Sequence, residues 1–69
     1  MSRAKLLGQN IKKYRLEKGL TQLELAKSVN LSREYIADIE RGLKNISLRK
    51  FYIIADILKV KCSQLINFD

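Results

Sequence analysis

The sequence predicts an all-α fold built from five short helices. Glycine and asparagine, which often end helices, recur about every 10 to 15 residues, a spacing typical of helices in globular domains. Threonine or serine stands just before three of the segments with helical apolar spacing, where an N-cap is expected. No hairpin turn joins two segments of alternating polarity, and this pattern argues against a sheet.

The first helix is expected over about residues 3–18, because Leu7, Ile11 and Tyr14 recur at helical spacing. Gly19 follows as a C-terminal stop.

A second helix is expected over about residues 22–28. Thr21 and Glu24 precede and open it with the spacing of a capping box. It should end near Asn30, a residue type that tolerates the left-handed conformation.

Two further N-caps, Ser32 and Ser47, predict helices over about residues 33–41 and 48–58. Gly42 stops the first of them. A short fifth helix is expected over residues 62–66. Four apolar residues share one side of the fourth helix and are assigned to the core: Leu48, Phe51, Ala55 and Leu58.

The second and third helices have the separation of a helix-turn-helix, here residues 22–41. Small or apolar residues occupy the positions where the helices should face each other and the core: Leu25, Ala26, Val29, Leu31, Ile36 and Ile39. The same residues would also serve the core of any helical hairpin. The small Ala26, the turn residue Asn30 and the capping signals in register together favour the helix-turn-helix.

The length of 69 residues allows one domain, residues 1–69. The chain has one cysteine, Cys62, and no histidine, so we expect no internal disulfide, no zinc finger and no other metal or cofactor site. A glycine-rich phosphate loop is also absent from the sequence. We therefore do not expect an enzyme, and we interpret Cys62 as a small packing residue.

The formal charge of +7 predicts a polyanionic partner, either nucleic acid or an anionic membrane surface. A merely basic protein without such a partner is the alternative. The longest apolar run covers residues 51–55 and is too short to span a bilayer. Without a signal peptide, and with a free cysteine, the chain is expected in a reducing cytoplasm.

The sequence resembles the phage Cro/repressor type of helix-turn-helix domain over about residues 7–66. The segments that carry the resemblance are residues 11–15 (IKKYR), 19–26 (GLTQLELA) and 39–42 (IERG). Residues 33–42 and 44–48 more narrowly resemble the controller proteins of restriction–modification systems. The resemblance implies a lambda-repressor-like DNA-binding domain. The chain departs from the family at Asn30, where glycine is usual, and at Glu34, where a neutral polar residue is commoner.

In a helix-turn-helix the second of the two helices enters the major groove of DNA. The candidate base-reading residues on it are Ser32, Arg33, Glu34, Tyr35, Ala37 and Asp38. Arg33 is the strongest candidate because a guanidinium donates two hydrogen bonds to guanine O6 and N7. A phosphate contact is the alternative role for Arg33.

The acidic and aromatic neighbours of Arg33 have open alternatives. Glu34 would accept from cytosine N4, orient a neighbouring arginine, or repel wrong sequences. Tyr35 would contact DNA or pack against the domain. Asp38 would pair with Arg41 or Lys44, or approach a base through water. The resemblance implies a different role for Glu40, a buried structural ion pair with Arg15.

Most of the positive charge lies outside the expected reading helix. Residues 1–18 carry six basic residues and one acidic residue, and residues 42–50 add three basic ones. Residues 32–41 have two basic and three acidic residues. The candidate phosphate contacts are Gln22, Arg41, Lys44 and Asn45. A solvent-exposed face is the alternative for Lys12, Lys13 and Lys18.

The region of about residues 48–69 is expected to form a homodimer surface. Ile53 and Ile57 lie opposite the core side of the fourth helix, and further apolar residues follow near the C-terminus. The candidate interface residues are Ile53, Ile57, Leu65, Ile66 and Phe68. Isolated exposed isoleucines without a partner are the alternative.

The sequence thus predicts a homodimeric regulator in the bacterial cytoplasm, associated with the nucleoid, that binds a pseudo-palindromic site on double-stranded DNA. A restriction–modification controller is the favoured type. A phage-type repressor, or an antitoxin that acts by binding protein, is the alternative. A membrane-surface protein would explain the charge but not the helix-turn-helix. We expect no small-molecule ligand, since this length has no room for a sensor domain.

Overall fold

Five α-helices follow one another in the computed structural model, which describes residues 2–68. They are α1 (Arg3–Glu17), α2 (Gln22–Ser28), α3 (Arg33–Glu40), α4 (Leu48–Leu58) and α5 (Cys62–Leu65). The all-α prediction is confirmed, and each helix begins at its expected residue and ends within one residue of the expected end. Met1 and Asp69, the ends of the expected domain, lie outside the described residues. None of the helices in residues 2–68 has the length and apolar character needed to cross a membrane.

Three helices are started by the side chains that the sequence predicted as caps, Thr21, Ser32 and Ser47, whereas the Ser2 cap of α1 was not predicted. The Thr21 hydroxyl accepts from the N–H of Glu24 at 3.0 Å, and the Thr21 N–H donates to the Glu24 carboxylate at 2.9 Å. These hydrogen bonds, first the one from the Thr21 backbone, lower the pKa of Glu24 below its ordinary 4.5. Ser2, Ser32 and Ser47 each accept from the N–H three residues on.

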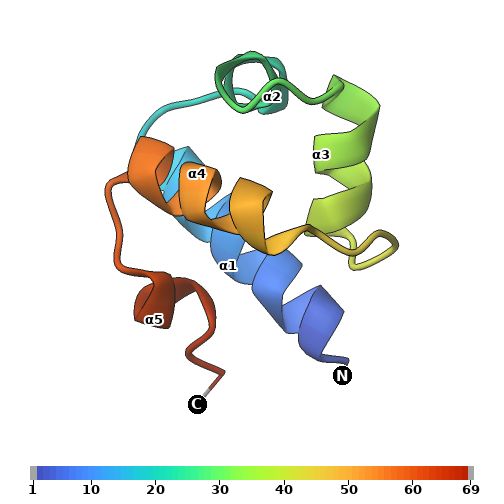
Figure 1. Ribbon diagram of the computed structural model, residues 1–69, viewed down its shortest axis with the longest axis vertical. Coiled ribbons are helices and arrows are strands. Elements are labelled where there is room, and N and C mark those ends of the chain that lie inside the picture. Colours follow the sequence, from blue (N-terminus) through green and yellow to red (C-terminus); the bar gives the residue numbers. More distant parts are fainter. Residues whose placement is uncertain (1, 69) are drawn as a thin grey trace.

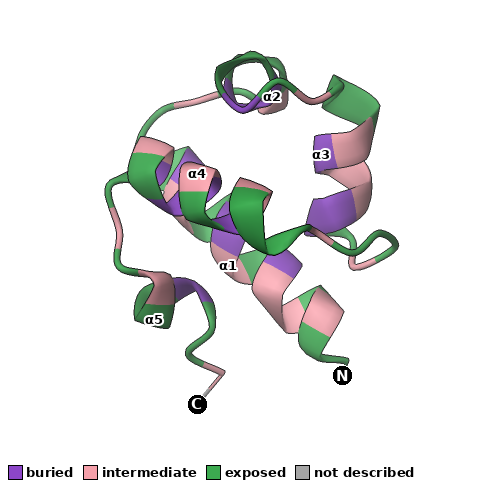
Figure 2. Ribbon diagram, viewed as in Figure 1, coloured by how far each residue is buried: buried purple, intermediate pink, exposed green. Residues whose placement is uncertain are grey.

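The helices enclose one apolar core, and their buried sides turn toward it (Figure 2). Its buried members are Ile11, Leu25, Ala26, Val29, Ile36, Ile39, Phe51, Ile54, Ala55, Leu58 and Leu65. The residues assigned to the helix-turn-helix core are buried, apart from Leu31, which is half-buried.

The prediction that Leu48 belongs to the core is wrong, because its side chain is 64% exposed. Leu48 is the first residue of α4, and helical side chains lean toward the N-terminus of their helix, so its side chain leans beyond the core. Ile54, one turn from both Phe51 and Leu58, is completely buried in its place.

Close packing fixes α3 against α1, while α4 crosses α1 in the centre of the view (Figure 1). A Cβ atom added at Gly8 would lie 2.2 Å from the carbonyl oxygen of Ile39 and 2.6 Å from that of Glu40. Only glycine fits there, because both obstacles are backbone atoms. The last turn of α3 therefore rests directly on α1.

Candidate nucleic-acid interface

α2, the following turn and α3 form the predicted helix-turn-helix (Figure 1). Asn30 has a φ of 58°, the left-handed conformation expected at this turn. The N–H of Leu31 then donates to the carbonyl of Ala26 at 2.9 Å. Ala26 itself is completely buried, as expected for a small residue where two helices cross closely.

A buried ion pair joins α3 to α1, as the family resemblance implied. Arg15 Nε lies 2.6 Å from Glu40 Oε2, and Arg15 Nη2 lies 3.1 Å from Oε1. Both side chains are less than one tenth exposed. Arg15 Nη1 also donates to the carbonyl of Leu20 at 2.8 Å. The carboxylate of Glu40 is thereby committed to structure and does not reach the exposed side of α3.

Gln22 connects this ion pair to the exposed end of α3. Its Nε2 donates to Glu40 Oε1 at 3.0 Å, and its Oε1 accepts from Arg33 Nη1 at 3.5 Å. Because the amide nitrogen of Gln22 is bonded to Glu40, the amide oxygen is the atom that faces Arg33. One amide proton of Gln22 is left for the phosphate contact predicted from the sequence, which remains a prediction. The link from Gln22 to Arg33 had no signal in the sequence pattern.

The exposed side of α3 carries two arginines, and each lies beside a carboxylate of the same segment. Arg33 Nη2 is 3.7 Å from Glu34 Oε1, and both side chains are at least half exposed. Arg41, which caps the C-terminus of α3, pairs with Asp38. Of the alternatives left open, the structure therefore contains Glu34 beside an arginine and Asp38 paired with Arg41.

Tyr35 packs against the domain, which is one of its two predicted roles. Its side chain contacts the core, and its hydroxyl donates to the backbone carbonyl of Asn45 at 2.7 Å. This bond ties the loop after α3 to the helix and leaves the Asn45 side chain exposed. Ser32 uses its hydroxyl oxygen as the cap of α3, and Ala37 is half-buried on the same helix.

Lysines near the helix-turn-helix differ in what they contact. Lys44 is exposed in the loop after α3. Lys50 instead directs its Nζ to the carbonyl of Val29 at 2.8 Å, where it stabilises the C-terminus of α2. One of the three positive charges in residues 42–50 is thus engaged within the domain.

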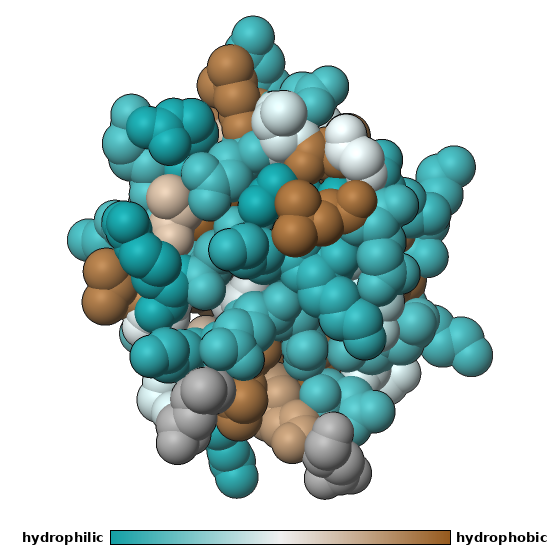
Figure 3. Space-filling model, turned by 180° about the vertical axis from the view of Figure 1, so that it is seen from behind, coloured by the Kyte–Doolittle hydropathy of each residue, from teal (hydrophilic) through white to brown (hydrophobic). Residues whose placement is uncertain are grey.

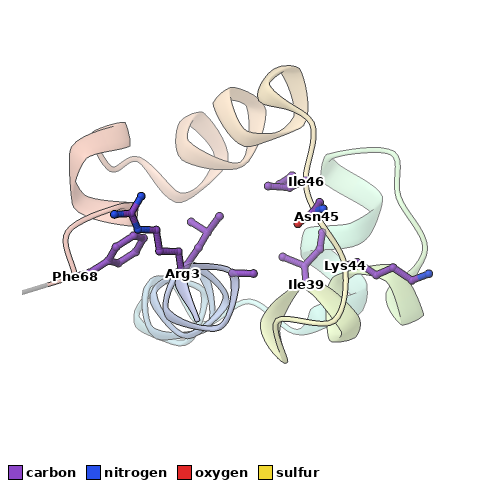
Figure 4. Close-up of a pocket in the computed structure, with 8 residues that line it drawn as sticks. Arg3, Ile39, Lys44, Asn45, Ile46 and Phe68 are labelled. Atoms are coloured by element: carbon purple, nitrogen blue, oxygen red, sulfur yellow. The ribbon is translucent and has the colours of Figure 1, made fainter. Parts of the chain in front are cut away.

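A hollow of about 300 Å³ lies beside the loop that follows α3 (Figure 4). It is lined by Arg3, Ala4, Leu7, Ile39, Lys44, Asn45, Ile46 and Phe68. Lys44 extends its amine away from Arg3 and Phe68 in this view. The hollow contains no cluster of catalytic or metal-ligating groups. Elsewhere in residues 2–68, too, His, Cys, Asp and Glu form no group of three that could hold a metal ion.

The residues predicted for a dimer surface do not all reach the surface. Leu65 is completely buried in the core, so the assignment of Leu65 to an interface is wrong. Ile53, Ile57 and Phe68 are half-buried, and Ile66 is 52% exposed. The four-residue helix α5 is too short for an apolar pattern to tell its inner from its outer side.

A further apolar groove next to Ile66 was not predicted. It is lined by Leu7, Ile46, Leu48, Phe51 and Ile66 and has a volume of about 360 Å³. The face of the molecule seen from behind carries mostly hydrophilic side chains, with separate hydrophobic ones between them (Figure 3).

Asn10 of α1 holds the segment that presents Ile66. Its Nδ2 donates to the carbonyl of Leu65 at 2.8 Å and to that of Asn67 at 3.1 Å. No pattern in the sequence indicated this role.

Comparison with known proteins agrees with this geometry. A family model described as helix-turn-helix matches residues 11–65. The immunity repressor of Bacillus phage phi105 is 45% identical over 61 residues, or 88% of this chain. The chain spans only 42% of that repressor's length.

Two solved structures are also similar. The restriction–modification controller C.AhdI from Aeromonas hydrophila is 34% identical with a TM-score of 0.85, and the match covers 90% of this chain and 94% of that one. The biofilm regulator SinR, solved in complex with DNA, is 37% identical with a TM-score of 0.79, over 86% and 95% of the two chains. The chain therefore belongs to the helix-turn-helix family of DNA-binding transcriptional regulators.

Proposed function

We propose that the protein is a sequence-specific regulator that binds a pseudo-palindromic operator as a homodimer, in the manner of a restriction–modification controller. The observation that carries this proposal is the position of Arg33 on an anchored helix. Its guanidinium is exposed at the N-terminal end of α3, and its helix is anchored to the core by the Arg15–Glu40 ion pair. A reading side chain needs both properties, exposure to the major groove and a rigid base.

Base reading is assigned first to Arg33, which has the two-pronged geometry to bind guanine O6 and N7. Ser32, Glu34, Ala37 and Asp38 share the N-terminal and outer part of α3 and complete the proposed reading surface. Tyr35 contributes by fixing the loop through Asn45.

Phosphate contacts are assigned to the ends of this surface. Gln22 opens α2, where free backbone N–H groups favour an anion. Arg41, Lys44 and Asn45 follow α3 and are exposed. These groups fix the protein on the duplex without selecting a sequence.

Self-association is assigned to partly exposed apolar side chains of α4 and of the segment that follows α5. The proposed interface residues are Ile53, Ile57, Ile66 and Phe68, together with the exposed Leu48, which lines a groove with Ile66. A second copy is the occupant we favour, because a two-fold dimer would set two copies of α3 about 34 Å apart, one turn of DNA.

The controller type is favoured by the match to C.AhdI, which covers nearly all of both chains. The phage repressor type remains the second candidate, because the phi105 repressor is also similar. Neighbouring reading frames for a methyltransferase and a nuclease would support the controller type. Footprinting at the protein's own promoter would identify the operator.

Selection from random duplex DNA, followed by binding measurements, tests the proposed function. We expect Arg33→Ala to abolish the preference for the selected duplex over a scrambled one and to leave weak binding to both. Lys61→Ala, which removes the same charge from an exposed site before α5, should keep the preference. An unchanged ratio of the two affinities in Arg33→Ala would remove the role assigned to Arg33.

A further inference from the structure

Both arginines of residues 32–41 already have an acidic neighbour in the free protein. Arg33 lies 3.7 Å from Glu34, and Arg41 pairs with Asp38. The side chains of Arg33, Glu34 and Arg41 are half to three-quarters exposed, and that of Asp38 is about one quarter exposed. Neither arginine is therefore a free cation before the protein meets DNA.

The ion pairs themselves add little to the stability of the fold. Exposed ion pairs stabilise proteins little, because water and salt screen them. Glu34 and Asp38 are also four residues apart on one helix, a spacing at which like charges repel. Each acid lowers the positive charge of the surface that the proposed function turns toward a polyanion.

The chemistry of DNA suggests what the acids do. Phosphates, the major-groove edge of guanine and the thymine O4 atom present only negative charge or acceptors to the protein. Donors in the major groove are the amino groups of cytosine N4 and adenine N6. A carboxylate beside a base is thus tolerated where such an amino group faces it and repelled elsewhere.

We propose that Glu34 and Asp38 are specificity-determining residues that hold Arg33 and Arg41 off DNA lacking correctly placed amino groups. On non-operator DNA the arginines stay with their carboxylates, so that fewer cations neutralise phosphates. On the operator, Arg33 binds guanine while the Glu34 carboxylate accepts from an adjacent cytosine or adenine amino group. This inference rests on the proposed function and adds the class of base step that α3 selects.

The test compares Glu34→Gln and Asp38→Asn with the unmodified protein on two duplexes of equal length, one selected and one scrambled. Each variant should bind the scrambled duplex about three- to tenfold more tightly. Its affinity for the scrambled duplex should also fall more steeply with salt. In a plot of the logarithm of affinity against the logarithm of salt concentration, the slope should steepen by about one for each phosphate that a freed arginine contacts. The ratio of selected to scrambled affinity should fall correspondingly.

Asp56→Asn is the matched control, because Asp56 is exposed on α4 and its loss changes the net charge by the same amount. It should change the affinity for the scrambled duplex less than twofold. An equal gain in Asp56→Asn, or no gain in either α3 variant, would overturn the inference. If the unmodified protein binds both duplexes equally, the proposed function is wrong. If the unmodified protein prefers the selected duplex and both α3 variants keep the same preference, only this inference is wrong.

Discussion

Glu40 shows how much one side chain contributes to the position of α3, the proposed reading helix. Its carboxylate accepts hydrogen bonds from Arg15 Nε, Arg15 Nη2 and Gln22 Nε2, and therefore joins α3 to both α1 and α2. The ion pair with Arg15 was expected from the family resemblance. The bond from Gln22 was not, because the sequence spacing of 18 residues says nothing of side-chain contact.

Removal of this carboxylate should destabilise the whole domain. We expect Glu40→Ala to lower the free energy of unfolding by about 3–5 kcal/mol, because it leaves the Arg15 guanidinium buried without its partner. Urea denaturation followed by circular dichroism measures the change. Glu17→Ala, at an exposed acid of α1, should change stability by less than about 0.5 kcal/mol. A Glu40→Ala protein as stable as the parent would contradict the assigned structural role.

At the scale of the helices, the starts were easier to predict than the ends. Thr21, Ser32 and Ser47 cap helices through contacts within three residues, so the local sequence contains the information. Lys59 ends α4 in the left-handed conformation with a φ of 55°, and lysine is not a residue type that signals this. Leu48 and Leu65 were assigned to the wrong surroundings, because burial at the ends of helices depends on elements distant in sequence.

Two substitutions test how much the left-handed backbone conformation at the ends of α4 and α1 costs in stability. Lys59→Gly should raise the free energy of unfolding by about 0.5–1 kcal/mol, because glycine adopts a positive φ without strain. Gly19→Ala should lower it by about 1 kcal/mol: Gly19 has a φ of 70°, and an added Cβ would meet no atom within 4 Å. Thermal unfolding of both variants measures the two changes, and a stabilised Gly19→Ala would contradict the backbone explanation.

At the scale of the molecule, the net charge of +7 is distributed unevenly. The reading helix was expected to be slightly acidic, and the structure shows how its acids lie beside its arginines. Composition and spacing therefore predicted the fold, whereas the position of the DNA-binding surface stays a prediction. They did not predict the pairing of charges or the apolar groove beside Ile66, since both depend on how side chains from several elements meet.

The proposed dimer predicts the salt dependence of DNA binding. With about eight phosphates neutralised by two copies, the log–log slope should be about −7. Ile66→Asp should give a monomer with about half that slope, because it places a charge in the apolar interface. Analytical ultracentrifugation and binding titrations from low to high salt measure both quantities.

Leu16→Asp is the control for this experiment, because Leu16 is 58% exposed on α1 and Ile66 is 52% exposed. Leu16→Asp should remain dimeric with an unchanged slope. An Ile66→Asp protein that sediments as a dimer would remove Ile66 from the interface.

The hydrogen bonds of Asn10 affect how two copies would associate. They bind the carbonyls on both sides of Ile66, so the segment that presents this side chain is already ordered in a single chain. Fixing the backbone of one residue costs about 1–2 kcal/mol of conformational entropy. For Ile66 the backbone entropy is lost when the domain folds, before two copies meet. Because this cost is met on folding, it does not reduce the free energy of association of the small apolar interface.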